Sequence, residues 1–222
     1  MRLETYSSRA ALMVGLAQMM AAELRAALAH GRATLSVPGG TTPGPVFDAL
    51  AQMDLDWGRV SVVLNDERWV GEDSARSNTR LLRSRLLVGP AAAATLVPLY
   101  VDRPTPEAGL AELAQGIAPH LPITVLLLGM GGDMHTASLF PGADRLAEAM
   151  APDAPILMAL RADAAGEPRI TLTARVLTAA RHVHILITGD EKRAALERAL
   201  QLPPDMAPVG VVLAQATVHW AP

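Results

Sequence analysis

An aspartate and a histidine stand two residues apart in the segment Gly129–Gly142, GMGGDMHTASLFPG, where an apolar run breaks into a glycine turn. The preceding run, Ile123–Leu128, has the composition of a strand buried on both faces of a sheet. Glycines let the backbone turn sharply there and approach a ligand closely. Because open parallel sheets bind ligands at the carboxyl ends of their strands, we expect Asp133 and His135 to lie in a ligand crevice.

The Asp133/His135 pair is suited to general base chemistry. An imidazole titrates near neutrality and can take a proton from a water molecule that attacks an ester carbonyl. Asp133 can fix the tautomer of this ring and stabilise the imidazolium that forms. Amide groups of the Gly129–Gly132 turn are candidate donors to the tetrahedral oxyanion. Met134 fills the third glycine position of a dinucleotide fingerprint, and the Gly-Lys-Ser/Thr of a Walker loop is missing.

A second glycine turn has the composition of an anion site. It joins a predicted strand to a helix start, and its residues are Gly39, Gly40, Thr41, Thr42 and Pro43. Converging N–H groups, two hydroxyl groups and the positive end of a helix together can hold an anion. An ordinary tight turn with a threonine cap is an equally good interpretation of this segment alone.

Three cationic side chains are candidates for binding a phosphate. Lys192 is the only lysine among 19 basic residues, and it lies near the start of a predicted helix, where its ammonium can reach the crevice. Arg68 and Arg169 carry planar guanidinium groups that match phosphate oxygens. The alternative for Lys192 is a solvated lysine at a helix start. The alternative for each arginine is a structural ion pair, which for Arg68 would be with the neighbouring Asp66 or Glu67.

Other titratable residues have simpler interpretations. Asp66 is a secondary catalytic candidate. Its safer interpretation is a strand-end cap or an ion-pair partner for Arg68. His182 and His184 share one face of a predicted strand but have no evident third metal ligand, so packing or hydrogen bonding is expected. The sequence predicts no metal site.

The segment Gly129–Gly142 resembles the signature of 6-phosphogluconolactonases, G-x-G-x-D-G-H-T-A-S-L-F-P-G, with Met134 in place of a glycine. Further segments resemble the family in the expected order: SVPGGTTP (36–43), NDERWV (65–70), SN (77–78), PRITLT (168–173) and GDEK (189–192). The resemblance covers nearly the whole chain.

Membership of that family would imply hydrolysis of 6-phosphoglucono-δ-lactone, a phosphorylated sugar lactone, without a metal or an organic cofactor. It implies His135 and Asp133 as the catalytic pair, and substrate binding by Gly39, Gly40, Thr41, Thr42, Arg68, Gly131, Arg169 and Lys192. A glucosamine-6-phosphate deaminase is one alternative, but its pattern places a glutamate where this chain has Phe140. A sugar-phosphate sensor is another, although no basic helix-turn-helix segment accompanies the site.

Composition favours one domain. The chain has 222 residues, half of them hydrophobic, which is enough for one sizeable core, and no linker divides residues 1–222. A net charge of −3 argues against a nucleic-acid surface, and the absence of cysteine excludes thiolate chemistry. No apolar run reaches the ~18 residues of a membrane span. We expect a soluble cytoplasmic protein.

Strand and helix patterns alternate, which predicts an α/β fold with a mostly parallel, doubly wound sheet. The predicted strands are 34–37, 59–64, 96–99, 123–128, 156–160, 182–188 and 216–220. The predicted helices are 43–52, 77–88, 106–118, 173–179 and 191–200. An amphipathic helix with a cap at Ser7 or Ser8 and an end at Gly31 is expected before them, and 136–139 is expected to open a helix.

Overall fold

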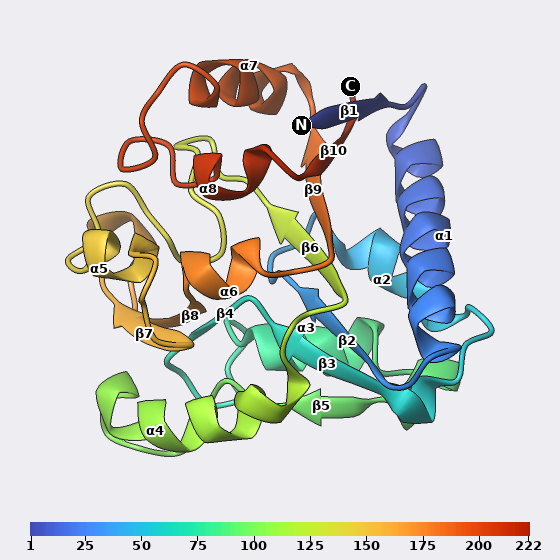
Figure 1. The fold of residues 1–222 in the computed structure, drawn as a ribbon, viewed down its shortest axis with the longest axis horizontal. Coiled ribbons are helices and arrows are strands. Elements are labelled where there is room, and N and C mark those ends of the chain that lie inside the picture. The colour runs from blue at the N-terminus through green and yellow to red at the C-terminus, as the bar shows by residue number, and fades with distance from the viewer.

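The computed structural model describes all of residues 1–222 and has a central sheet of seven parallel strands (Figure 1). The strand order is β1-β10-β9-β6-β2-β3-β5. The bounds are β1 (Arg2–Thr5), β2 (Ala33–Val37), β3 (Val60–Leu64), β5 (Thr95–Val97), β6 (Val125–Gly129), β9 (His182–Thr188) and β10 (Thr217–Ala221). The prediction of a mostly parallel α/β fold is confirmed.

The composition of the middle strands accounts for their position in the sheet. β2 and β3 are short runs of largely β-branched and aliphatic residues that are buried along their whole length, as expected for strands covered on both faces. Val37 lies opposite Leu64 and Leu35 lies opposite Val125, so β2, β3 and β6 run side by side. Their carboxyl ends therefore meet at one edge of the sheet.

Helices cover both sides of this sheet, with α1 and α2 on one side and α6 and α8 on the other (Figure 1). The bounds are α1 (Arg9–Leu28), α2 (Gly44–Ala51), α3 (Asn78–Arg85), α4 (Pro106–Ile117), α5 (Leu146–Met150), α6 (Ala174–Thr178), α7 (Asp190–Ala199) and α8 (Gly210–Leu213). The Ser8 hydroxyl caps α1 by accepting from the Ala11 amide at 3.2 Å, as predicted.

The helix α1 is long and apolar enough to cross a membrane by length and composition. Its buried side chains recur at helical spacing, with Leu12, Leu16, Met20 and Leu24 all at 0% exposure. This side packs against α2 and against β2, β6 and β10. In this fold α1 is therefore a core helix.

A second, antiparallel sheet is a correction to the predicted topology. It has the order β4-β8-β7, with β4 at Asp66–Arg68, β7 at Leu157–Leu160 and β8 at Arg169–Leu172. The predicted strand 156–160 therefore exists, but it pairs with β8 and not with the parallel sheet. β4 and β8 were not predicted as strands, and β1 was not predicted either.

The segment 136–139 does not open a helix. Thr136 and Leu139 form an isolated antiparallel bridge, and Ala137 between them has φ 49°. The Thr136 hydroxyl donates to the Gly129 carbonyl at 2.9 Å and closes the loop on itself. A left-handed residue and this side-chain bond are incompatible with a helical start.

Both sheets share one hydrophobic cluster of 62 buried residues. Leu126 and Ile185 contribute from the central sheet, and Met158 and Ile170 contribute from the small sheet. The small sheet is therefore fixed against the central sheet by common packing.

Candidate functional site

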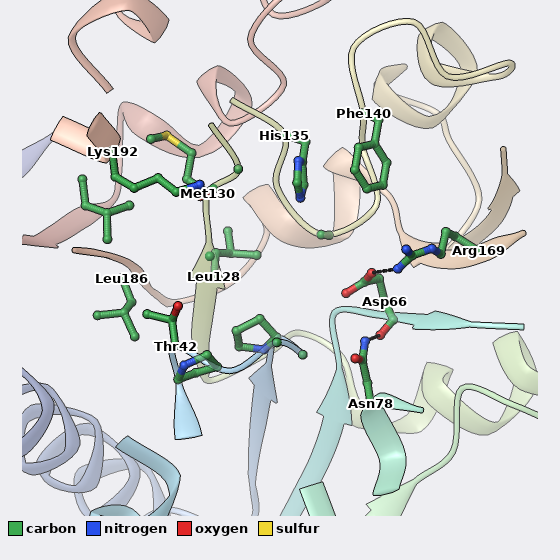
Figure 2. Close-up of a pocket in the computed structure, with 18 of the residues that line it drawn as sticks. Thr42, Asp66, Asn78, Leu128, Met130, His135, Phe140, Arg169, Leu186 and Lys192 are labelled. Carbon is green, nitrogen blue, oxygen red and sulfur yellow. Dashed lines mark hydrogen bonds and ion pairs between the residues drawn. The ribbon is translucent and has the colours of Figure 1, made fainter. Parts of the chain in front are cut away.

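A pocket of about 390 Å³ opens at the carboxyl ends of the central strands (Figure 2). Its lining comes from the turn after β2, from β4, from the loop after β6 and from α7. The lining residues that sequence analysis singled out are Gly39, Gly40, Thr42, Arg68, Gly131, His135, Arg169 and Lys192. Thr41 and Asp133 do not line it.

His135 and Asp133 form a hydrogen-bonded pair at this pocket. His135 Nδ1 lies 2.6 Å from Asp133 Oδ1, and the same oxygen accepts from the His135 amide at 3.2 Å. The hydrogen bond from His135 holds the pKa of Asp133 below its usual value, against a smaller opposing effect of burial. Asp133 thus stays ionised and fixes the orientation of the imidazole, whose ring lines the pocket.

The turn that carries this pair is tightly packed. A Cβ at Gly131 would clash with His135 Nδ1 and Asp133 Oδ1. The Gly131 amide donates to the His135 carbonyl at 2.9 Å, so it is not a free oxyanion donor as the sequence had suggested. Met134, at the usual glycine position, has φ 67°, and its carbonyl accepts from the Val209 amide at 3.1 Å.

Phe140 closes the pocket beside the histidine. Its ring centroid lies 4.1 Å from that of His135, and the Arg169 guanidinium lies 5.9 Å from the ring centroid (Figure 2). An apolar ring therefore separates the imidazole from the buried arginine.

Lys192 reaches the pocket from the first turn of α7. Its Nζ donates to the Met130 carbonyl at 2.9 Å, next to the glycine turn. Thr42 lies at the same end of the pocket in Figure 2, on the turn that leads to α2. Gly40 in this turn has φ 85°, a conformation that favours glycine.

Arg169 and Asp66 lie at the other end of the pocket (Figure 2). Arg169 Nη2 donates to the Ala165 carbonyl at 2.7 Å, and Nη1 lies 3.8 Å from Asp66 Oδ2. The same Asp66 oxygen accepts from the Ser138 hydroxyl at 2.5 Å. Asp66 therefore pairs with Arg169 and Ser138, not with Arg68 as its simpler interpretation held.

Arg68 lines this end of the pocket but makes no ion pair with Asp66 or Glu67. Its Nη1 donates to the Arg76 carbonyl. The Nε atoms of Arg68 and Arg169 are buried and have no hydrogen-bond partner. Burial lowers the pKa of Arg169, and Asp66 partly offsets that effect. Two unpaired donors beside a cavity are suited to a ligand rich in oxygen atoms.

Asn78 is a pocket residue whose contacts the sequence did not reveal. Its Nδ2 donates to the Asp66 carbonyl at 2.9 Å, and its carboxamide leaves no room for a Cβ at Gly39. The one signal was the SN dipeptide, because Ser77 caps α3 by accepting from the Arg80 amide at 3.2 Å.

The comparisons with known proteins agree with this geometry. The family described as glucosamine-6-phosphate isomerases/6-phosphogluconolactonase matches residues 7–220. The chain is 41% identical to a 6-phosphogluconolactonase of Rhizobium meliloti (strain 1021) over 98% of this chain and 97% of that protein. It is 42% identical to one of Pseudomonas aeruginosa over 99% of this chain and 94% of that protein.

Solved structures give the same result. A 6-phosphogluconolactonase from Shewanella baltica OS155 superposes with a TM-score of 0.96 at 33% identity, over 100% of this chain and 97% of that one. A monomeric glucosamine-6-phosphate deaminase has a TM-score of 0.83 at 16% identity and shares the fold.

Proposed function

The chain belongs to the glucosamine-6-phosphate isomerase/6-phosphogluconolactonase family, and we propose that His135, held by Asp133, activates the water in its reaction. The activity is that of a 6-phosphogluconolactonase, which opens 6-phosphoglucono-δ-lactone to 6-phosphogluconate in the pentose phosphate pathway. Relatives with this activity match nearly the whole length of the chain.

The observation that carries the catalytic assignment is the 2.6 Å contact between His135 Nδ1 and Asp133 Oδ1. With Nδ1–H donating to the carboxylate, Nε2 is left as the basic atom of the ring. It takes a proton from water as the water oxygen bonds to C1 of the lactone. The tetrahedral intermediate then loses its bond between C1 and the ring oxygen, and that oxygen receives the proton.

We assign the substrate phosphate to the end of the pocket that holds Lys192, Gly40 and Thr42. An ammonium group, a hydroxyl group and a glycine turn before a helix are donors of the kind that bind phosphate. Arg68 and Arg169 then donate to oxygen atoms at the other end of the substrate. The Thr41 side chain lies outside the pocket lining and has no role in this proposal.

The proposal also holds that catalysis requires no metal or organic cofactor and that the enzyme acts in the cytoplasm. A carboxylate-oriented imidazole can by itself take the proton of a water molecule that attacks a lactone carbonyl. The absence of cysteine is compatible with a reducing compartment.

Replacing Asp133 by Asn tests the catalytic pair. The amide cannot stabilise an imidazolium and favours the wrong tautomer of His135, so kcat should fall by about 10²-fold or more with little change in KM. The rate is followed with freshly prepared lactone after subtraction of its spontaneous opening. A variant that keeps wild-type kcat would refute the role of Asp133.

Comparison of two lactones tests the phosphate assignment. If the phosphate is the main binding contact, gluconolactone without phosphate should show a kcat/KM lower by about 10²-fold or more. Equal values for the phosphorylated and unphosphorylated lactones would remove the assignment.

A further inference from the structure

The side chain of Glu67 is completely buried and points away from the reaction. Its two neighbours in β4, Asp66 and Arg68, line the pocket, whereas Glu67 does not. This alternation follows from the strand, in which successive side chains face opposite sides. At 0% exposure, the Glu67 carboxylate is out of contact with water and is held by hydrogen bonds to Arg68, Asn78, Thr79 and Ser77.

Five donors surround this carboxylate. Oε1 accepts from the Arg68 amide at 2.8 Å and from the Asn78 amide at 2.8 Å. Oε2 accepts from the Thr79 amide at 2.7 Å, the Thr79 hydroxyl at 2.9 Å and the Ser77 hydroxyl at 3.3 Å. Two of the three amides belong to the first turn of α3, where unpaired N–H groups and the helix dipole favour a negative charge.

The carboxylate therefore ties β4 to the start of α3, and two pocket residues, Arg68 and Asn78, depend on that connection. Arg68 follows Glu67 directly, and its own amide is one of the five donors. Asn78 provides another, and its side chain donates to the Asp66 carbonyl at 2.9 Å (Figure 2). The same side chain fills the space beside Gly39.

We propose that Glu67 is a positioning residue for substrate binding, which sets Arg68 and Asn78 against the pocket through its hydrogen bonds to β4 and α3. This inference rests on the proposed function, because it takes Arg68 as a substrate contact. His135 and Asp133 stand on the loop after β6 and form no hydrogen bond with Glu67, so we expect Glu67 to affect KM more than kcat.

Glu67→Gln is the discriminating substitution because it keeps the shape of the side chain. If the amide nitrogen replaces Oε1, the Arg68 and Asn78 amides both lose their acceptor. If it replaces Oε2, the hydroxyls can turn to accept, but the Thr79 amide cannot. Either orientation loosens the connection while leaving the packing intact.

The expected result is a KM for the phosphorylated lactone about tenfold higher, with kcat within about threefold of wild type. Leu82→Ala is the matched control, because Leu82 is buried in the hydrophobic core on the same helix and does not line the pocket. It should lower thermal stability at least as much and leave KM unchanged. If both variants raise KM equally, or if Glu67→Gln leaves KM unchanged, the proposal is overturned.

Arg68→Met separates this inference from the proposed function. A raised KM in Arg68→Met with a normal KM in Glu67→Gln refutes the positioning role alone. A normal KM in both refutes the assignment of Arg68 as a substrate contact as well. Should Glu67→Gln fail to fold, Thr79→Val removes one donor and keeps the carboxylate. A smaller rise in KM is then expected, and an unchanged KM would overturn the inference.

Discussion

Gly131 and Gly132 are neighbours in the turn before His135, but their surroundings differ. A Cβ at Gly131 would clash with His135 Nδ1 and Asp133 Oδ1, whereas a Cβ at Gly132 would find only Lys192 Nζ, at 3.9 Å. Gly131→Ala should therefore displace the proposed catalytic pair, His135 and Asp133, and lower kcat by about 10²-fold, since a shift near 1 Å can cost that much. Gly132→Ala should keep near wild-type kcat. Similar losses of kcat in both variants would mean that alanine disturbs the backbone of the turn and that the contact with His135 and Asp133 is not the cause.

Lys192 is open to test by chemistry as well as by mutation, because it is the only lysine in the chain. Lys192→Met should remove about 1.5 to 3 kcal/mol of binding free energy, the usual contribution of a hydrogen bond to a charged group, and raise KM about tenfold or more. Acetylation of the wild-type protein should have the same effect, and 6-phosphogluconate should protect Lys192 from the reagent. An unprotected lysine together with a wild-type KM in the variant would leave Lys192 with only its structural hydrogen bond to the Met130 carbonyl.

At the residue scale, local segments could be predicted and long-range partners could not. His135, Asp133 and Lys192 could be proposed from the sequence because a glycine turn or a helix start marks each of them within a few residues. The contacts of Asp66 with Ser138 and Arg169 join residues 72 and 103 positions away. They depend on the pairing of β4 with β8, which no local pattern indicates.

Side chains from α1, β9 and β10, together with Tyr6, form a chain of hydrogen bonds that affects the stability of the fold in acid. His184 Nε2 lies 2.7 Å from Glu23 Oε2, His184 Nδ1 lies 3.0 Å from His219 Nε2, and His219 Nδ1 lies 2.9 Å from the Tyr6 hydroxyl. The expected packing or hydrogen-bonding role of His184 is confirmed. Burial, with smaller effects of His184 and Arg2, lowers the pKa of His219 to about 3.

This shift predicts a loss of stability in mild acid. The unfolded chain binds a proton at His219 below its usual pKa of 6.5, while the folded protein does not until about pH 3. The contribution of neutral, buried His219 to the free energy of unfolding is therefore present above pH 6.5 and is lost progressively below it. The free energy of unfolding should fall by about 2 kcal/mol between pH 7 and pH 5. Urea titrations between pH 7 and pH 5 measure this change in the free energy of unfolding. This range lies above the pH at which most carboxylates titrate.

His219→Phe is the control for that titration. The variant should be less stable at pH 7, because Tyr6 and His184 lose a partner, but its stability should depend less on pH between 7 and 5. An unchanged pH dependence would mean that His219 is not the source of the effect.

The small sheet shows why elements are harder to predict when tertiary contacts create them. The central strands were found because buried parallel strands are continuous apolar runs. β4 consists of Asp-Glu-Arg, a composition typical of a loop. It is a strand because its backbone pairs with β8 and because Glu67 finds its donors in α3. The sequence Asp-Glu-Arg by itself indicates neither the pairing with β8 nor the hydrogen bonds from α3.

For the whole molecule, the shared core predicts that residues 1–222 unfold as one cooperative unit. Trp69 reports on the small sheet, since its amide donates to the Pro168 carbonyl at 2.9 Å, and Trp220 lies in β10 of the central sheet. In variants that keep only one of the three tryptophans of the chain, either Trp69 or Trp220, the fluorescence and far-UV circular dichroism transitions should coincide in urea. Separate midpoints would divide the chain into two units.

We infer that this fold brings His135 to a bound phosphorylated lactone as the general base. Stopped-flow hydrolysis of freshly generated 6-phosphoglucono-δ-lactone, corrected for spontaneous opening, tests it most directly when wild type is compared with His135→Ala. The substitution should lower kcat by about 10²- to 10⁴-fold, with KM, circular dichroism and the urea midpoint nearly unchanged. A folded His135→Ala protein that hydrolyses the lactone at the wild-type rate would contradict the account.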